Sequence, residues 1–177
     1  MIIFLGIAGS GKSTQCRLLA ESLDCKYISV GQLLRKGANS ADQEKLVNGN
    51  LLNNSVVIGV VEAEIANIAK SNEFIIDGFP RTIEQAKWIT GIMSSDLVRV
   101  VHIKADATEI IKRLRLRNRQ DDNTDAINKR IGEYNISIGP IIEEFKSKHI
   151  DVYDIDGFNT IEDVHEQIVA YINGTRS

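Results

Sequence analysis

The feature of this sequence that most constrains its fold and chemistry is a Gly-rich loop near the start of the chain. Residues 6–13 read Gly-Ile-Ala-Gly-Ser-Gly-Lys-Ser, a G-x-x-x-x-G-K-S spacing between an apolar run at 1–5 and a helical pattern at 12–23. Glycines let successive backbone N–H groups point inward around an anion, and the helix start adds the positive end of its dipole. The pattern therefore predicts a nucleotide-phosphate site rather than a plain strand–helix turn.

The residue types within this loop predict separate roles. Lys12 is expected to reach the β- and γ-phosphates of ATP, and the Ser13 hydroxyl to ligate Mg²⁺. The predicted phosphate-binding set is Gly9, Ser10, Gly11, Lys12, Ser13 and Thr14. Because the loop does not identify the phosphoryl acceptor, it leaves kinases, GTPases and motor ATPases open.

Apolar runs of strand length alternate with helical patterns along the whole chain. We predict strands at 1–5, 26–29, 74–77, 97–103 and 152–155, and helices at 12–23, 40–48, 55–71, 82–93, 107–118, 124–148 and 160–173. Such alternation favours an α/β fold in which helices cover both faces of a five-stranded parallel sheet. Pro140, directly after Gly139, is expected to kink or divide the longest helix. With 177 residues and no repeat or linker, the chain reads as one domain, 1–177.

Composition excludes several classes of protein. The chain has 21 Lys and Arg against 24 Asp and Glu, for a net charge of −3, which disfavours a non-specific nucleic-acid or membrane binder. Two cysteines, Cys16 and Cys25, make neither a disulfide framework nor a zinc site. A signal peptide and a membrane-spanning run are not expected, so we predict a cytoplasmic protein, with a monomer as the default.

A second motif follows the third predicted strand, where residues 74–85 read FIIDGFPRTIEQ. Asp77 stands at the carboxyl end of the strand, where α/β sheets bind ligands, and it can orient Mg²⁺ through water. Gly78 and Pro80 form a stiff turn that presents Arg81 as a bidentate phosphate clamp. Taken alone, this segment is also compatible with a strand–turn–helix corner bearing a surface arginine.

Arginines cluster in the second half of the chain at 113, 115, 117 and 119, and Arg130 follows. A solvated helix face is the simplest interpretation of such a run. Arg130, however, shares a helix face with Ile127 and Tyr134, which a merely solvated arginine would avoid. Several arginines converging on a polyphosphate are what phosphoryl transfer by positioning and electrostatics requires. His102, in an apolar strand, is expected to be a hydrogen-bonded core histidine or a surface-facing one rather than a ligand.

The two motifs together resemble the adenylate kinase family of nucleoside monophosphate kinases. The strings GIAGSGKSTQC and FIIDGFPRTIEQ are similar to the family's phosphate loop and acceptor motif, and YISVGQLLR at 27–35 is similar to its monophosphate-site segment. Residues 119–123, followed by Arg130, resemble its lid region. The resemblance spans nearly the whole chain, in order. It implies a P-loop kinase fold, a nucleoside-monophosphate-binding insertion at 29–58, a minimal lid at 116–123, and Mg²⁺-dependent transfer of the ATP γ-phosphoryl.

The resemblance also implies residue roles. Arg113 packs on the donor adenine near Gly157, and Arg117 holds donor phosphates. Arg119 and Arg130 bridge the donor and acceptor phosphates. Arg35 and Arg81 anchor the acceptor phosphate, while the Gln85 amide reads its base. The remaining acceptor-site residues are Val30, Asn50, Leu51, Leu52, Gly78, Phe79 and Pro80.

The sequence departs from the family pattern around the acceptor base and the lid. Val30 and Gln32 replace the usual Thr and Asp, the segment after Gly49 lacks Val-Pro, and Asn118 alone separates Arg117 from Arg119. No cysteine lies there, which excludes a zinc-binding lid. We favour AMP as the acceptor. A UMP/CMP-type kinase, a catalytically weak nucleotide-binding regulator and a kinase for a small non-nucleotide substrate remain open alternatives.

Overall fold

The computed structural model describes residues 1–68, 73–117 and 123–174, without the side chains of residue 107 and residues 115–117. Five strands of the described chain form one sheet in the order β2-β3-β1-β4-β5, and every neighbouring pair is parallel. The strands are β1 (Ile2–Leu5), β2 (Lys26–Ser29), β3 (Phe74–Asp77), β4 (Arg99–Lys104) and β5 (Val152–Asp156). The predicted α/β fold is confirmed.

The central strand shows why its sequence is continuously apolar. All four residues of β1 are at most 3% exposed. Side chains alternate between the faces of a strand, so Ile3 and Leu5 join one core and Ile2 and Phe4 join the other. Burying a side chain of this size stabilises the fold by about 1.5–3 kcal/mol. A strand covered on both faces has no position at which a polar residue would reach water.

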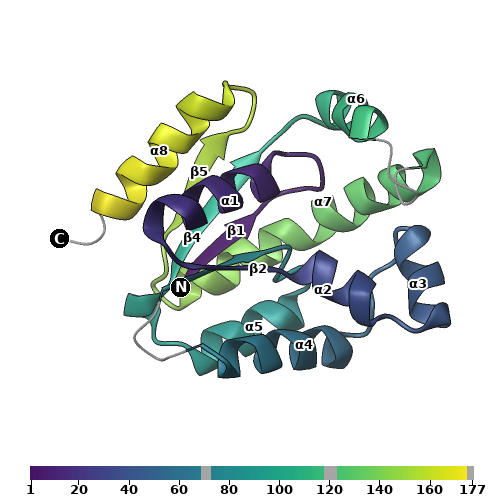
Figure 1. Cartoon of the computed structure of the whole chain (residues 1–177), viewed down its shortest axis with the longest axis horizontal. Helices are drawn as coiled ribbons and strands as arrows, with labels where there is room; N and C mark the ends of the chain where they lie inside the picture. Colours follow the sequence, from purple (N-terminus) through teal and green to yellow (C-terminus); the bar gives the residue numbers. More distant parts are fainter. Residues whose placement is uncertain (69–72, 118–122, 175–177) are drawn as a thin grey trace.

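Helices cover both faces of the sheet (Figure 1). On one face lie α1 (Lys12–Leu23) and α8 (Ile161–Gly174), and on the other lie α4 (Asn54–Ala66), α5 (Ile83–Ile92) and α7 (Thr124–Ser147). A third apolar cluster joins α6 (Ala107–Arg117) to α7 and the phosphate loop through Ile7, Ile110, Leu114 and Ile127. Two short helices, α2 (Val30–Gly37) and α3 (Ser40–Val47), follow the carboxyl end of β2. None of the helices in the described ranges combines the length and apolar character needed to cross a membrane.

The elements differ most from the sequence predictions in four places, one of which is α4, which was predicted to run to residue 71 and ends at Ala66. Helix α2 was not predicted, and β4 begins at Arg99 because residues Ser95–Leu97 form a 3₁₀ turn. Pro140 was expected to kink or divide the longest helix; it does not divide it, since α7 runs from Thr124 to Ser147 through it. The carbonyl that loses its hydrogen bond to Pro140 belongs to Ile136, which is 79% exposed and can bond water. Beyond Pro140, buried Ile141 and Phe145 hold the helix against the core.

Candidate active site

The phosphate loop lies at the carboxyl end of β1 and turns into α1. Gly6 has φ +141°, and a Cβ there would lie 2.5 Å from the Ile103 carbonyl oxygen, so only glycine allows the loop to cross β4 this closely. Gly11, with φ +94°, begins α1, and no side chain of the described residues caps that helix start. The Ser10 hydroxyl is buried and has no hydrogen-bond partner among the described residues. An unsatisfied hydroxyl inside a ring of backbone N–H groups fits a phosphate oxygen.

Two side chains of α1 face the loop and the neighbouring strand. Lys12 is 8% exposed, and its Nζ donates to the Ile7 carbonyl at 2.7 Å, which holds the ammonium group over the loop. The Ser13 hydroxyl donates to Asp77 Oδ2 at 2.5 Å. Asp77 ends β3, where it is paired in register with Phe4 of β1 and Ser29 of β2. The phosphate loop and the acidic strand end therefore meet, as the sequence predicted.

Tyr27 also contacts the Asp77 carboxylate, and the sequence analysis did not predict this contact. Its hydroxyl donates to the same Asp77 oxygen at 2.9 Å. Burial, and then the negative charge of Asp77, raise the pKa of the Tyr27 phenol, so it remains a donor at neutral pH. Tyr27 thus fixes the orientation of Asp77 from the adjacent strand.

The Ser13–Asp77 pair fits a magnesium ion shared with nucleotide phosphates. Mg²⁺ prefers hard oxygen ligands and usually takes only one or two carboxylates, with water and phosphate completing its shell. A hydroxyl and a carboxylate beside the phosphate loop supply that chemistry. No group of three or more His, Cys, Asp or Glu residues in the described ranges forms an all-protein metal cage.

A cleft of about 570 Å³ runs from the phosphate loop across the carboxyl ends of β1, β2 and β3. It brings together most of the residues that the sequence analysis singled out. Those that line it are Gly9, Ser10, Gly11, Lys12, Ser13, Thr14, Arg35, Asn50, Leu51, Leu52, Asp77, Gly78, Arg81, Gln85, Arg113, Arg130 and Gly157. Segments from the beginning, middle and end of the chain thus share one cavity.

Three arginines gather in the acceptor half of the cleft. Desolvation lowers the pKa of Arg81; the negative charge of Asp77 opposes this shift, and repulsion from Arg130 and Arg35 adds to it. Its Nε donates to the Gly78 carbonyl at 3.0 Å, and Arg130 Nη2 donates to the Leu46 carbonyl at 3.3 Å. An arginine remains charged at neutral pH. This half of the cleft is therefore built to receive an anion.

The predicted donor-base residues meet at the other end of the cleft. Arg113 Nη1 donates to the Gly157 carbonyl at 3.1 Å, and its Nε donates to Glu109 at 3.1 Å. The guanidinium lies 6.0 Å from the centre of the Phe158 ring. The guanidinium is planar, and these two bonds fix its orientation, so it offers a flat face on which a base can stack.

Gln85 lies in the first turn of α5 and is 2% exposed. Its Oε1 accepts from the Arg81 backbone N–H at 2.8 Å, and its Nε2 donates to Asn54 Oδ1 at 2.9 Å. The sequence analysis identified Gln85 but not Asn54.

Several predicted residues do not line the cleft. Val30, the first residue of α2, is 1% exposed and packs in the core. Phe79 and Pro80 line a smaller neighbouring cavity of about 70 Å³ instead. The side chain of Arg117 and the whole of Arg119 lie outside the described residues. Conversely, Arg17 and Asn159 line the cleft without having been predicted.

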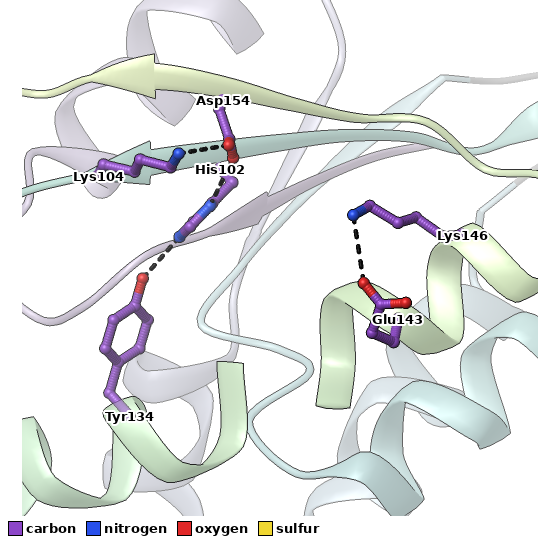
Figure 2. A network of polar contacts seen from close by, with 6 residues as sticks. All are labelled: His102, Lys104, Tyr134, Glu143, Lys146 and Asp154. Carbon is purple, nitrogen blue, oxygen red and sulfur yellow. Dashed lines mark hydrogen bonds and ion pairs between the residues drawn. The ribbon is translucent and has the colours of Figure 1, made fainter. Parts of the chain in front are cut away.

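His102 is hydrogen-bonded at both ring nitrogens, as predicted for a core histidine (Figure 2). Its Nδ1 lies 2.8 Å from Asp154 and its Nε2 lies 2.6 Å from the Tyr134 hydroxyl, while Lys104 pairs with the same aspartate. The network joins β4, β5 and α7 and does not open onto the main cleft.

Comparison with known proteins agrees with this geometry. A family profile described as adenylate kinase matches residues 4–150. The chain belongs to the adenylate kinase family. The adenylate kinase of Leptospira biflexa is 33% identical over 97% of this chain and 98% of its own length. Those of Xylella fastidiosa and Corynebacterium urealyticum are 32% and 30% identical, each over at least 96% of both chains. The predicted class, a phosphotransferase of the nucleoside monophosphate kinase type, is confirmed.

Proposed function

We propose that this protein transfers the γ-phosphoryl group of ATP to AMP, with Mg²⁺, to give two molecules of ADP. The observation that carries the proposal is the single cleft shared by the phosphate loop, three arginines and Gln85. Phosphoryl transfer needs little covalent chemistry from the protein, because positioning and charge stabilisation supply most of the catalysis. The cleft supplies both positioning and charge stabilisation.

The donor half binds ATP. The loop N–H groups and the Ser10 hydroxyl hold the phosphates, and Lys12 follows the transferring group. Arg113, with Gly157, takes the adenine. Ser13 and Asp77, the latter through water, would hold a magnesium ion, which would supply neutralisation of the phosphate charge.

The acceptor half binds AMP. Arg35 and Arg81 anchor its phosphate, and Arg130 lies where the donor and acceptor phosphates approach each other. The residues here are already placed near one another, so charge that develops on the transferring group meets preorganised donors. Arg117 and Arg119 remain proposed as further members of this set.

The proposal extends to the two insertions, the cellular location and the oligomeric state of the protein. Residues 29–58, which contain α2, α3 and the beginning of α4, form the monophosphate-binding insertion, and 116–123 form a minimal lid. Closure of these segments over both nucleotides excludes water and suppresses ATP hydrolysis. The protein acts in the cytoplasm, as a monomer, without nucleic-acid or membrane partners.

A panel of acceptors tests the proposal. ADP formation is measured with ATP, Mg²⁺ and one of AMP, dAMP, CMP, UMP or GMP. We expect AMP to give the highest kcat/KM. Higher turnover with UMP or CMP would reassign the acceptor, and ATP binding without turnover on any member would point to a regulator and overturn the proposal.

A further inference from the structure

A set of hydrogen bonds surrounds the Gln85 amide and continues to the surface, where Asn54 Nδ2 donates to Glu84 Oε2 at 3.4 Å. Asn54, the first residue of α4, accepts at Oδ1 from Gln85 Nε2 at 2.9 Å and from the Thr82 hydroxyl at 3.0 Å. Gln85 Oε1 accepts from the Arg81 N–H at 2.8 Å, and Thr82 Oγ1 accepts from the Gln85 N–H at 3.2 Å. Asn54 does not line the cleft, whereas Gln85 does. Any effect of Asn54 on the substrate must therefore pass through Gln85.

Two backbone groups fix the direction of every bond in this set. The Arg81 N–H can only donate, so the amide atom that faces it must be the oxygen of Gln85. The Gln85 N–H also can only donate, so the Thr82 hydroxyl accepts from it and gives its own hydrogen to Asn54. Asn54 therefore presents its oxygen to the –NH₂ group of Gln85. A flipped Gln85 amide would place donor against donor at Arg81 and acceptor against acceptor at Asn54.

The fixed amide leaves a defined recognition edge. Beyond these bonds, the Gln85 amide retains one N–H and one oxygen lone pair. Together they form an adjacent donor and acceptor. Adenine offers the matching pair, an acceptor at N1 and a donor at its 6-amino group, and cytosine offers the same pair at N3 and its 4-amino group. Guanine, hypoxanthine and uracil present the opposite pair, a ring N–H beside a carbonyl. They would match only a flipped amide.

We infer that Asn54 is a positioning residue that sets acceptor-base selectivity by locking the orientation of the Gln85 amide. The locked amide accepts 6-amino purines and 4-amino pyrimidines and rejects their oxo counterparts. The inference rests on the proposed function, since it requires the acceptor base to reach Gln85. It goes further in naming a residue outside the cleft and the chemical basis of discrimination.

The test compares pairs of acceptors that differ mainly at this edge. AMP against IMP, and CMP against UMP, are assayed as ratios of kcat/KM with the wild type, Asn54→Ala and Asn54→Asp. Asn67→Ala is the matched control, because it changes the same residue type at the other end of α4, where the side chain is exposed and donates to the Ala63 carbonyl. Thermal melting of each variant monitors folding.

In the wild type we expect AMP to exceed IMP by on the order of 10²-fold or more, because the wrong base leaves buried polar groups unpaired. Asn54→Ala should lower the AMP/IMP and CMP/UMP ratios about tenfold, mainly through KM, because the amide then has one orienting bond rather than two. Asn54→Asp retains the acceptor oxygen but would face the Glu84 carboxylate, so it is made together with Glu84→Gln. This variant should keep the wild-type ratios, as should Asn67→Ala.

The outcomes separate this inference from the proposed function. A merely structural role of Asn54 would lower the turnover of both members of a pair together. Unchanged kcat/KM ratios in Asn54→Ala therefore overturn the inference. AMP turnover by the wild type would still uphold the proposed function in that case. Equal losses of selectivity in Asn54→Ala and in Asn54→Asp made with Glu84→Gln also overturn the inference, since the acceptor oxygen would not be the cause. A wild type that does not phosphorylate AMP overturns both.

Discussion

Replacing Arg81 by alanine separates a binding role from a structural one. One Arg81 donor, Nε, is committed to the Gly78 carbonyl, which leaves both Nη groups for the acceptor phosphate. Two charge-assisted hydrogen bonds at about 1.5–3 kcal/mol each give about 3–6 kcal/mol. Arg35 and Arg130 remain and compensate in part, so we expect the low end, about 3 kcal/mol, or a fall of roughly 10²-fold in kcat/KM for AMP.

The same change should not destabilise the fold. At the Arg81 guanidinium, attraction to Asp77 opposes repulsion from Arg130 and Arg35. Alanine removes both effects and keeps the backbone N–H that bonds Gln85. We therefore expect a melting temperature close to that of the wild type. Steady-state ADP formation and thermal unfolding, measured on the same preparation, give both quantities.

Arg99→Ala is the control with the opposite expectation. Arg99 begins β4, is paired with Glu73 at 3.1 Å, and has a side chain 18% exposed. Its loss should lower the free energy of unfolding by about 1–3 kcal/mol and leave kcat/KM nearly unchanged. Near-wild-type activity of Arg81→Ala, or loss of its activity in step with its stability, would refute our reasoning.

Three further predictions concern other parts of the molecule. Lys12→Ala should lower kcat/KM on the order of 10²-fold or more, with the fold intact by circular dichroism, and normal turnover would contradict its assigned role. Arg113→Ala should raise the KM for ATP and leave that for AMP unchanged in two-substrate kinetics; a rise confined to AMP would place the donor base elsewhere. Burial lowers the pKa of His102 even though Asp154 opposes the shift, so the unfolded chain takes up this proton first as pH falls. Stability should therefore drop below about pH 6.5, and less so in His102→Gln, as urea unfolding at several pH values will show.

The predictable parts of this structure are those in which local sequence decides the backbone. The apolar run of β1, the glycines that follow it and the helix after them specify a strand, an anion-binding turn and a helix without reference to the rest of the chain. The same holds for Asp77 at the end of an apolar strand. Parallel strands align their carboxyl ends, so two such motifs had to meet at one edge of the sheet.

The residues that were missed act across long sequence separations. Asn54 bonds Gln85 from 31 residues away and Tyr27 bonds Asp77 from 50 residues away. Asn54 belongs to no motif. Tyr27 begins the segment that resembles the monophosphate site, but nothing in that segment indicates a bond to Asp77. Val30 shows the converse error: its position in a motif suggested contact with substrate, but the start of α2 turns its side chain into the core. Motif position fixes the backbone more firmly than it fixes the direction of each side chain.

The manner in which the cleft holds its cations explains how a chain with a net charge of −3 can bind two polyanions. Lys12, Arg81 and Arg130 donate to the carbonyls of Ile7, Gly78 and Leu46. A carbonyl orients a cation through its dipole without cancelling the cation's charge. A fourth cation of the cleft, Arg113, donates both to the Gly157 carbonyl and to Glu109. The gathering of these oriented side chains in one cleft, rather than the overall charge of the chain, decides where an anion binds.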